Sequence, residues 1–246
     1  MNKLFDKAII IKENFERGGV FSALYFGTRF KCPICGSSLR KFIPYGQRSN
    51  ARCPGCGSLE RHRLMWLFLN NETTIFNDKL TLLHFAPERF FLDRFMKMTN
   101  LSYTPADINP SLPLIKKIDI IDIPMNDNHY DCVICCHVLE HVHDDQKAMR
   151  EIYRVLKPGG WAILQVPIGR LKTFEDHAVQ TPQDRQRVFG QHDHVRIYGL
   201  DYVTRLETAG FKVNVINYAK KVSDEKIRKY ALSQKDIYLC SKERAS

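Results

Sequence analysis

Four cysteines near the start of the chain have the residue type and the spacing of a metal site. They form two Cys-x-x-Cys pairs, each followed by glycine, and the segment from Gly36 to Arg52 separates the pairs. Each pair places two thiolates on one side of a tight turn, and two such turns complete a tetrahedral site with no open position. We therefore predict a zinc ribbon that holds a structural Zn²⁺ through Cys32, Cys35, Cys53 and Cys56. The alternative is four cysteines in turns without a metal.

Basic residues surround these cysteines. Lys and Arg number 13 against 6 Asp and Glu in residues 1–79, but only 24 against 21 in residues 80–246. An uneven basic excess favours an acidic partner such as nucleic acid or an anionic substrate. Two interpretations stay open for residues 31–63, namely an RNA-binding face and a solvated surface on a structural module. The basic and aromatic side chains concerned are Arg40, Lys41, Phe42, Tyr45, Arg48, Arg52, Arg61, His62 and Arg63.

A second group with chemical potential contains His137, Glu140 and His141. These residues stand at i, i+3 and i+4, so a helical turn would bring them to one face. Three interpretations compete: they shape a ligand-binding edge, they bind a divalent metal ion, or they brace the turn. Further along, His192 and His194 alternate with other residues, so both imidazoles could face one side.

Histidine is the usual general base at neutral pH. We predict His194 as the first candidate base and His141 as the second. The alternative for His194 is a surface histidine on a mobile loop.

The elements that must position these residues read as an α/β domain. Residues 130–136 are a short apolar run and predict a buried strand, residues 144–156 have helical periodicity, and residues 161–166 predict a second strand. Lys157-Pro158-Gly159-Gly160 should end the helix and reverse the chain. A strand, a crossover helix and another strand imply parallel pairing. Three cysteines on the first strand, Cys132, Cys135 and Cys136, cannot converge as ligands and are interpreted as small core residues.

The remaining pattern extends this domain on both sides. Strands are expected over residues 80–85, 103–107, 211–218 and 236–240, and helices over residues 4–15, 59–69, 90–98 and 200–209. Residues 169–198 form a connection too long for a simple loop, which indicates function. A polar stretch at residues 70–79 marks a boundary. We therefore expect an N-terminal helix with the zinc ribbon in residues 1–70 and a second domain in residues 80–246.

The order of residues in 119–160 resembles the class I S-adenosylmethionine-dependent methyltransferases, in particular the branch of ubiquinone and menaquinone biosynthesis. The resemblance rests on Asp119, Ile123-Pro124, Asp127, Tyr130-Asp131, Val138-Leu139-Glu140-His141 and Leu156-Lys157-Pro158-Gly159-Gly160. It covers residues 80–168 well and the rest loosely. It implies a Rossmann-like, seven-stranded methyltransferase sheet with S-adenosylmethionine as cofactor.

The resemblance also implies a donor site. The first strand of this family normally ends in an acid and a Gly-x-Gly turn, but here Phe85-Ala86-Pro87-Glu88 follows. S-adenosylmethionine has no pyrophosphate, so the backbone need not approach it as closely as it must approach a dinucleotide. The missing glycines therefore argue against NAD as the cofactor. Asp107, at the end of the next expected strand, would accept the ribose hydroxyls. The alternative is a loop acid that caps a turn. The full set expected at the donor is Phe85, Ala86, Pro87, Glu88, Asp107, Ile108, Asp119, Ile120 and His137.

Three functions remain open at this level. The first is methyl transfer to an anionic small molecule or a sugar-containing acceptor, and the second is methyl transfer to RNA. The third is a non-catalytic module that binds the cofactor, because the glycines are missing.

The composition indicates which general class of protein this is. At 246 residues with 44% hydrophobic and 26% charged residues, the chain is ordinary for a globular protein. It has no apolar stretch long enough to span a bilayer and no signal-peptide pattern, so we expect a cytoplasmic protein without a membrane span. The eight cysteines of the chain would not form disulfides in that compartment.

Overall fold

The computed structural model describes residues 24–244 and divides them into two compact units. The cysteine unit contains residues up to Thr74 and the later segment Asn217–Lys235. The sheet unit contains Ile75–Ile216 and residues from Asp236 onward. The helix expected over residues 4–15 lies outside the described residues. The return of residues 217–235 to the cysteine unit is a feature that the sequence pattern did not indicate.

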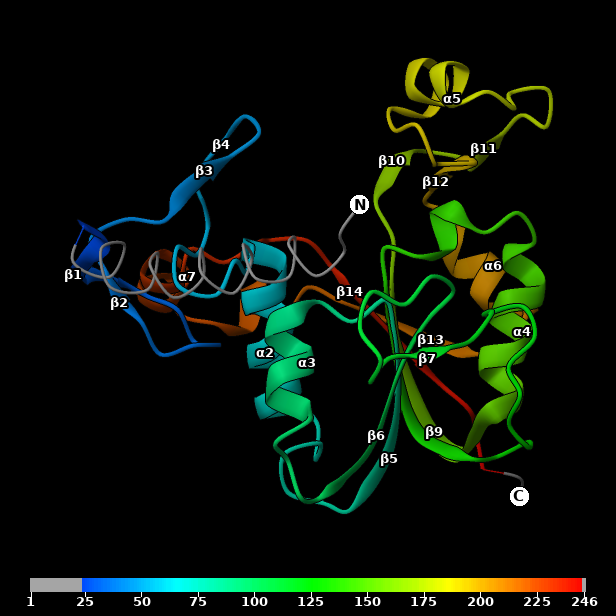
Figure 1. Ribbon diagram of the computed structural model, residues 1–246, viewed down its shortest axis with the longest axis horizontal. Coiled ribbons are helices and arrows are strands. Elements are labelled where there is room, and N and C mark those ends of the chain that lie inside the picture. Colours follow the sequence, from blue (N-terminus) through cyan, green and yellow to red (C-terminus); the bar gives the residue numbers. More distant parts are fainter. Residues whose placement is uncertain (1–23, 245–246) are drawn as a thin grey trace, which may run out of the picture. The chain divides into compact units, whose positions relative to one another are not determined.

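The sheet unit is built on the seven-stranded sheet that the resemblance implies (Figure 1), and its order is β13-β14-β9-β8-β5-β6-β7. Five neighbouring strands are parallel, whereas β14 is antiparallel to both β9 and β13. The fold class predicted from the sequence is therefore confirmed. The strands are β5 (Leu80–Phe85), β6 (Leu101–Asp107), β7 (Lys116–Lys117), β8 (Tyr130–Cys136), β9 (Leu156–Gln165), β13 (Lys212–Ile216) and β14 (Ile237–Ser241).

Helices cover both faces of this sheet. Helix α3 (Arg89–Phe95) lies on one face, and α4 (Asp145–Val155) and α6 (Tyr202–Thr208) lie on the other (Figure 1). Helix α4 begins where the Asp144 side chain accepts a hydrogen bond of 2.8 Å from the Lys147 amide. Its apolar stripe, Ala148, Met149, Ile152 and Val155, is fully buried against the sheet. The three cysteines of β8 are buried as predicted.

One boundary differs from the prediction. Residues 157–160 do not reverse the chain but belong to β9. The Gly159 amide donates to the Lys242 carbonyl at 2.7 Å, and the Lys242 amide donates to the Gly160 carbonyl at 3.1 Å. Pairing with the chain that follows β14 therefore keeps the segment extended, and the positive φ of Gly159 gives it a local kink.

The long connection of residues 169–198 has its own architecture. A three-stranded sheet of order β10-β12-β11 lies with helix α5 at the end of the unit where β9 finishes (Figure 1). Thr181 caps α5 through a hydrogen bond from the Asp184 amide, and Gly190 ends it in the left-handed conformation. The elements are β10 (Ile168–Arg170), β11 (Phe174–Glu175), α5 (Pro182–Phe189) and β12 (Arg196–Gly199).

The cysteine unit consists of two hairpins, a long helix and the returning segment. Its elements are β1 (Phe26–Lys31), β2 (Ser38–Leu39), β3 (Ile43–Tyr45), β4 (Arg48–Arg52), α2 (Glu60–Glu72), the short helix η2 (Tyr218–Lys221) and α7 (Asp224–Tyr230). Strands β1 and β2 pair, as do β3 and β4. Tyr218 contacts Phe68 of α2 edge to face, with ring centroids 5.4 Å apart.

Two basic residues of this unit, His62 and Arg63, are not on its surface. Arg63 is completely buried, and its guanidinium lies 3.9 Å from the centroid of the Phe42 ring. Its side chain donates to the carbonyls of Ala51, Ser58, Tyr230 and Ala231. The interpretation of Arg63 as part of a nucleic-acid face is therefore wrong, because this residue organises the interior of the unit.

None of the helices in the described part of the chain is long and apolar enough to cross a membrane.

Candidate functional site

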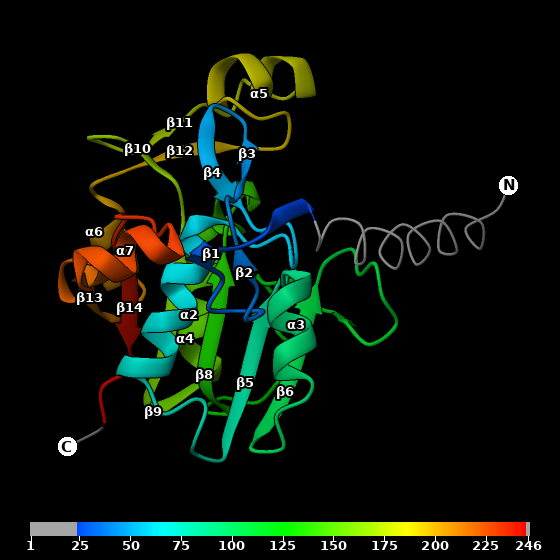
Figure 2. The ribbon, with the colours of Figure 1, turned by 90° about the vertical axis from the view of Figure 1, so that its left-hand side faces the viewer.

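The carboxyl ends of the central strands meet at one edge of the sheet. Strand β5 pairs in parallel with β6 and β8, so that Phe85 lies opposite both Ala106 and Cys135. These three strands lie side by side in Figure 2. The turns that follow them therefore leave the sheet at the same level. The strand order reverses between β5 and β8. In open α/β sheets, ligands bind at this edge and at this switch point.

The turn after β5 keeps the backbone geometry that its missing glycines would supply. Ala86 has a φ of 45°, in the left-handed region, and its amide donates to the Ala106 carbonyl at 2.8 Å. A residue with a side chain in this conformation is strained, and such strain is concentrated at functional sites. Glu88, two positions further on, starts helix α3 as its N-cap residue.

Beneath this turn lies His84, which is fully buried. Burial lowers its pKa to about 3, so the imidazole is neutral at physiological pH. Its Nδ1 lies 3.0 Å from the Tyr103 hydroxyl. The Glu88 carboxylate, 3.8 Å from Nε2, therefore faces a neutral ring and not a cation.

Two acids follow the neighbouring strands. Asp107 ends β6, and its Oδ1 accepts a hydrogen bond of 2.8 Å from the Asn109 amide, which is the turn-capping contact considered above. Its Oδ2 has no protein partner among the described residues. Asp119 Oδ1 similarly accepts from the Ile121 amide at 3.1 Å. Ile108 is about half exposed, whereas the Ile120 side chain is buried in the core.

His137 follows β8 with a strained backbone. Its φ is 56°, and its amide donates to the Gln165 carbonyl at 2.8 Å. The ring Nδ1 lies 3.1 Å from Oε1 of Glu140, at the start of the short helix η1 (Leu139–His141). The chain therefore turns sharply at the carboxyl edge, which carries His137 and the buried Glu140 into the same corner.

The two candidate bases lie next to each other. The rings of His141 and His194 meet edge to face with centroids 4.7 Å apart. His194 is only 7% exposed, and burial, followed by the nearby His141, lowers its pKa, which keeps it neutral. His192 is exposed, so the expectation that both histidines of this segment serve one side is wrong.

Arg196 holds His194 in this place. It is almost completely buried and donates to the carbonyls of Leu139, Val142 and His143. Its Nε also donates to Glu175 at 2.6 Å. The long connection is thereby fixed to the segment that follows β8. Sequence reasoning missed Arg196, whose only signal was a basic residue beside the two histidines.

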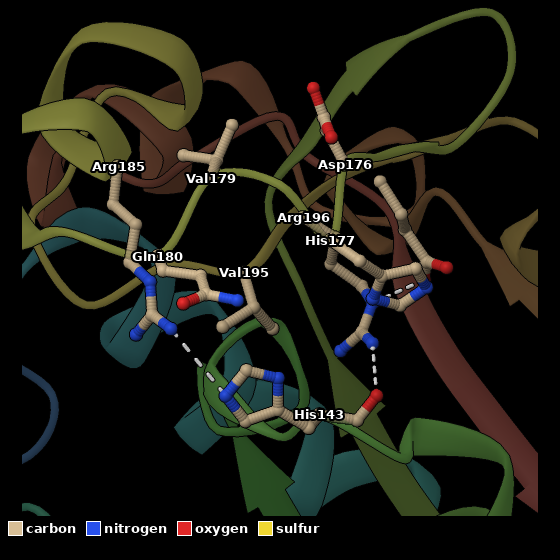
Figure 3. Close-up of a pocket in the computed structure, with 9 residues that line it drawn as sticks. His143, Asp176, His177, Val179, Gln180, Arg185, Val195 and Arg196 are labelled. Atoms are coloured by element: carbon tan, nitrogen blue, oxygen red, sulfur yellow. Dashed lines mark hydrogen bonds and ion pairs between the residues drawn. The ribbon is translucent and has the colours of Figure 1, made fainter.

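A cavity of about 530 Å³ opens beside this pair, between α5, β11 and the segment after η1 (Figure 3). Arg185 directs its guanidinium toward His143, with Nη2 and Nε2 3.5 Å apart, and its Nε is buried without a partner among the described residues. The Glu175 carboxylate is engaged by Arg196 and Arg205. The side chains that line the cavity are those of His143, Glu175, Asp176, His177, Val179, Gln180, Arg185, Val195 and Arg196.

The four cysteines of the other unit converge as predicted. Their sulfur atoms all lie within 4.8 Å of one another, and Cys32–Cys56 and Cys35–Cys53 are each separated by 3.7 Å. A tetrahedral zinc site with Zn–S bonds of about 2.3 Å requires sulfurs about 3.8 Å apart. The donor set and its spacing therefore fit a zinc ion. Cys32 and Cys35 lie in the connection between β1 and β2, and Cys53 and Cys56 lie between β4 and α2, with Cys32 and Cys53 fully buried.

Comparison with known proteins agrees with this architecture. Residues 89–164 match a family described as a methyltransferase domain. The chain therefore contains a class I methyltransferase domain at the centre of its sheet unit.

Matches to individual proteins cover a smaller part. The ubiquinone/menaquinone biosynthesis C-methyltransferase UbiE of Vibrio cholerae is 46% identical over 39 residues, and that of Enterobacter sp. (strain 638) is 50% identical over 38 residues. These segments represent about 15% of the length of either relative.

Among solved structures, the YcgJ protein of Bacillus subtilis and an S-adenosylmethionine-dependent methyltransferase of Mesorhizobium loti each align with a TM-score of 0.50 at 13% identity. These alignments cover 76% and 72% of this chain, and 100% and 96% of the solved chains. The [4+2]-cyclase SpnF aligns with the same TM-score at 15% identity, over 83% of this chain and 87% of its own. These likenesses establish the fold, and the fold alone does not name the reaction.

Proposed function

We propose that this protein transfers the methyl group of S-adenosylmethionine to an acceptor that carries an anionic group. The observation that carries the proposal is the convergence of the strained turns at Ala86 and His137 with Asp107 at the switch point of the sheet. The match of residues 89–164 to the methyltransferase domain supports the same donor. The sulfonium is already activated, so the protein chiefly has to align donor and acceptor.

The donor would bind along the carboxyl edge. Asp107 would accept hydrogen bonds from the ribose hydroxyls through its free Oδ2, and Ile108 and Asp119 would flank the adenine. Glu88 would attract the amino group of the methionine portion, and the backbone of Phe85, Ala86 and Pro87 would lie under it. Ile120 would contribute only its backbone, because its side chain is buried. His137 would close the edge beside the methyl group.

Acceptor binding is assigned to the cavity of the long connection. The acidic Glu175 is neutralised by two arginines, and the Asp176 carboxylate accepts a hydrogen bond from the Ala178 amide. Arg185, His143 and His177 supply the positive or titratable charge of the lining. A carboxylate or phosphate on a small molecule or glycan fits such a lining, because Arg binds these groups through paired N–H donors. His194, with His141 beside it, would promote loss of the proton from the attacking group.

Replacing Asp107 with asparagine tests the donor site. The amide can still cap the turn at Asn109 but loses the charge, so affinity for S-adenosylhomocysteine should fall about 10- to 100-fold, as expected for a lost hydrogen bond to a charged group. Isothermal titration calorimetry measures this change. Asp122→Asn, at an exposed acid nearby, is the matched control and should bind normally. Unchanged affinity in Asp107→Asn would exclude the ribose role.

RNA is the second candidate acceptor, and one surface of the cysteine unit favours it. Arg29, Arg228 and Lys229 line a hollow together with Phe30, and the Arg29 guanidinium lies 5.4 Å from the centroid of that ring. Cations interleaved with an aromatic ring suit a phosphate backbone with unstacked bases. Arg48, by contrast, is paired with Glu60 at 2.9 Å.

On this alternative, the double variant Arg29→Gln/Arg228→Gln should weaken binding of a single-stranded RNA uniformly across sequences. The slope of log affinity against log salt should decrease by about one for each phosphate that the variant no longer neutralises. Fluorescence anisotropy over a salt series measures both quantities, with Lys212→Gln in the sheet unit as control. An unchanged slope would remove this hollow from consideration as an RNA site.

A further inference from the structure

Three side chains beside the acceptor cavity form a cluster that neither the zinc ribbon nor the donor site uses. Glu140 and His141 come from helix η1, and His194 comes from the segment that leads into β12. One potential metal-ligand atom from each residue lies within 4.8 Å of the other two. The two segments are far apart in sequence, and the backbone hydrogen bond from the Val195 amide to the Glu140 carbonyl, 3.0 Å, holds them together.

One oxygen of the Glu140 carboxylate in this cluster lacks a hydrogen-bond partner among the described residues. Glu140 is 1% exposed, its Oε1 contacts His137, and its Oε2 has no hydrogen-bond partner among the described residues. Burying a carboxylate oxygen without a partner costs about 1–3 kcal/mol or more. Native proteins therefore rarely leave such an oxygen unpaired unless a ligand, a water molecule or an ion completes it.

The two histidines are arranged as ligands usually are. His141 Nδ1 lies 3.3 Å from Oδ2 of Asp193, which leaves Nε2 available. Metal-binding histidines commonly contact a carboxylate through one ring nitrogen and the metal through the other. His194 has no hydrogen-bond partner for its ring among the residues that the structure describes, and it is buried beside His141.

We propose that Glu140, His141 and His194 bind a divalent transition-metal ion such as Zn²⁺. Two imidazoles favour such an ion over Mg²⁺ or Ca²⁺, which prefer oxygen ligands. Tetrahedral Zn²⁺ needs its donors about 3.4 Å apart for bonds near 2.1 Å, so binding draws the three side chains together. In contrast to the four-cysteine site, three protein ligands leave a coordination position open.

This proposal rests on the proposed methyl transfer and specifies its acceptor as a hydroxyl compound. The acceptor oxygen occupies the open position, where the ion lowers the pKa of the hydroxyl and its O–H proton leaves to solvent water. The oxygen electron pair then forms the C–O bond to the methyl carbon while the C–S bond breaks. The bonding pair stays on sulfur, which gives S-adenosylhomocysteine and a methyl ether. In the loaded enzyme His194 acts through the ion and not as a free base.

Metal content of the full chain tests the proposal. Protein dialysed against Zn²⁺ and then against metal-free buffer should retain two zinc ions by plasma mass spectrometry. Glu140→Gln, which keeps the side-chain shape, and His194→Ala should each retain one. His192→Ala removes an exposed histidine two positions away and should retain two. Fewer than two ions in the unsubstituted protein, or two in either cluster variant, would overturn the proposal.

Calorimetry with S-adenosylhomocysteine separates this proposal from the methyltransferase assignment. Both cluster variants should bind the donor product with affinity within about twofold of the unsubstituted protein, which also shows that they are folded. Donor binding with only one zinc ion in the unsubstituted protein would remove the second metal and leave His194 as a direct base. Loss of donor binding from the unsubstituted protein would instead remove the proposed function itself. If Glu140→Gln fails to bind the donor product, it is not correctly folded, and the zinc content of His194→Ala then tests the second metal site.

Discussion

Replacing Cys56 with serine should remove one zinc ion from the protein and unfold the cysteine unit. Structural zinc sites contribute roughly 10–16 kcal/mol of binding free energy, and this energy is also folding energy because the site does not exist in the unfolded chain. The hairpin strands of the unit have only two to six residues, so we expect them to depend on the metal site.

Hydrogen exchange measures this outcome locally. Amides of residues 24–74 and 217–235 should lose protection, whereas those of β5, β8 and β9 should keep it, because the sheet unit has its own core. Cys240→Ser, which removes a buried thiol from the sheet, serves as control and should keep the metal. Native protection of the hairpins in metal-depleted Cys56→Ser would contradict the structural role of the site.

Replacing Arg63 with methionine should destabilise the same unit by roughly 3–5 kcal/mol, the range for removing one partner of a buried charged network. Four carbonyls lose their donor: those of Ala51 and Ser58 beside the cysteines, and those of Tyr230 and Ala231 in the returning segment. The positive charge of Arg63 also compensates the negative charge of the metal site, since a zinc ion bound by four thiolates carries a net charge of −2. Burial lowers the Arg63 pKa, while Cys32 and Cys53 raise it.

Urea unfolding of the zinc-saturated protein, followed by a probe in the cysteine unit, measures the loss. Arg63→Lys should restore little, because an ammonium group cannot reproduce the planar fork that reaches four carbonyls. Arg52→Met at an exposed position is the matched control and should change stability by less than about 0.5 kcal/mol. An Arg63→Met midpoint equal to that of the control would show that the buried network is not required.

Much of the sheet was predictable because its strands are short apolar runs between polar turns. Residues 80–85 and 130–136 were predicted with the bounds that β5 and β8 have. The seven-stranded sheet was implied by the resemblance, whereas the strand order was not predicted, because periodicity carries no information about which strands are neighbours. The error at residues 157–160 arose because Pro158 and the two glycines usually end a helix, while pairing with the distant Lys242 decides the local conformation here.

The candidate site was predicted in part. The cysteine spacing is a local signal, so Cys32, Cys35, Cys53 and Cys56 were found from the sequence alone. The proximity of His141 to His194 depends on a contact between distant segments of the chain, fixed by the buried Arg196. Residues 217–235 gave no apolar pattern, since α7 has no buried residue and contributes backbone carbonyls to Arg63.

Arg63 and the carbonyls of Tyr230 and Ala231 are separated by 167 and 168 positions, which has a consequence for biosynthesis. The two cysteine pairs are close in sequence and can capture a metal ion soon after they leave the ribosome. The acceptors that complete the interior around Arg63 are translated only after almost the whole methyltransferase domain. We therefore expect the cysteine unit to finish folding only after residues 217–235 have been synthesised, although its cysteine pairs precede the methyltransferase domain in the chain.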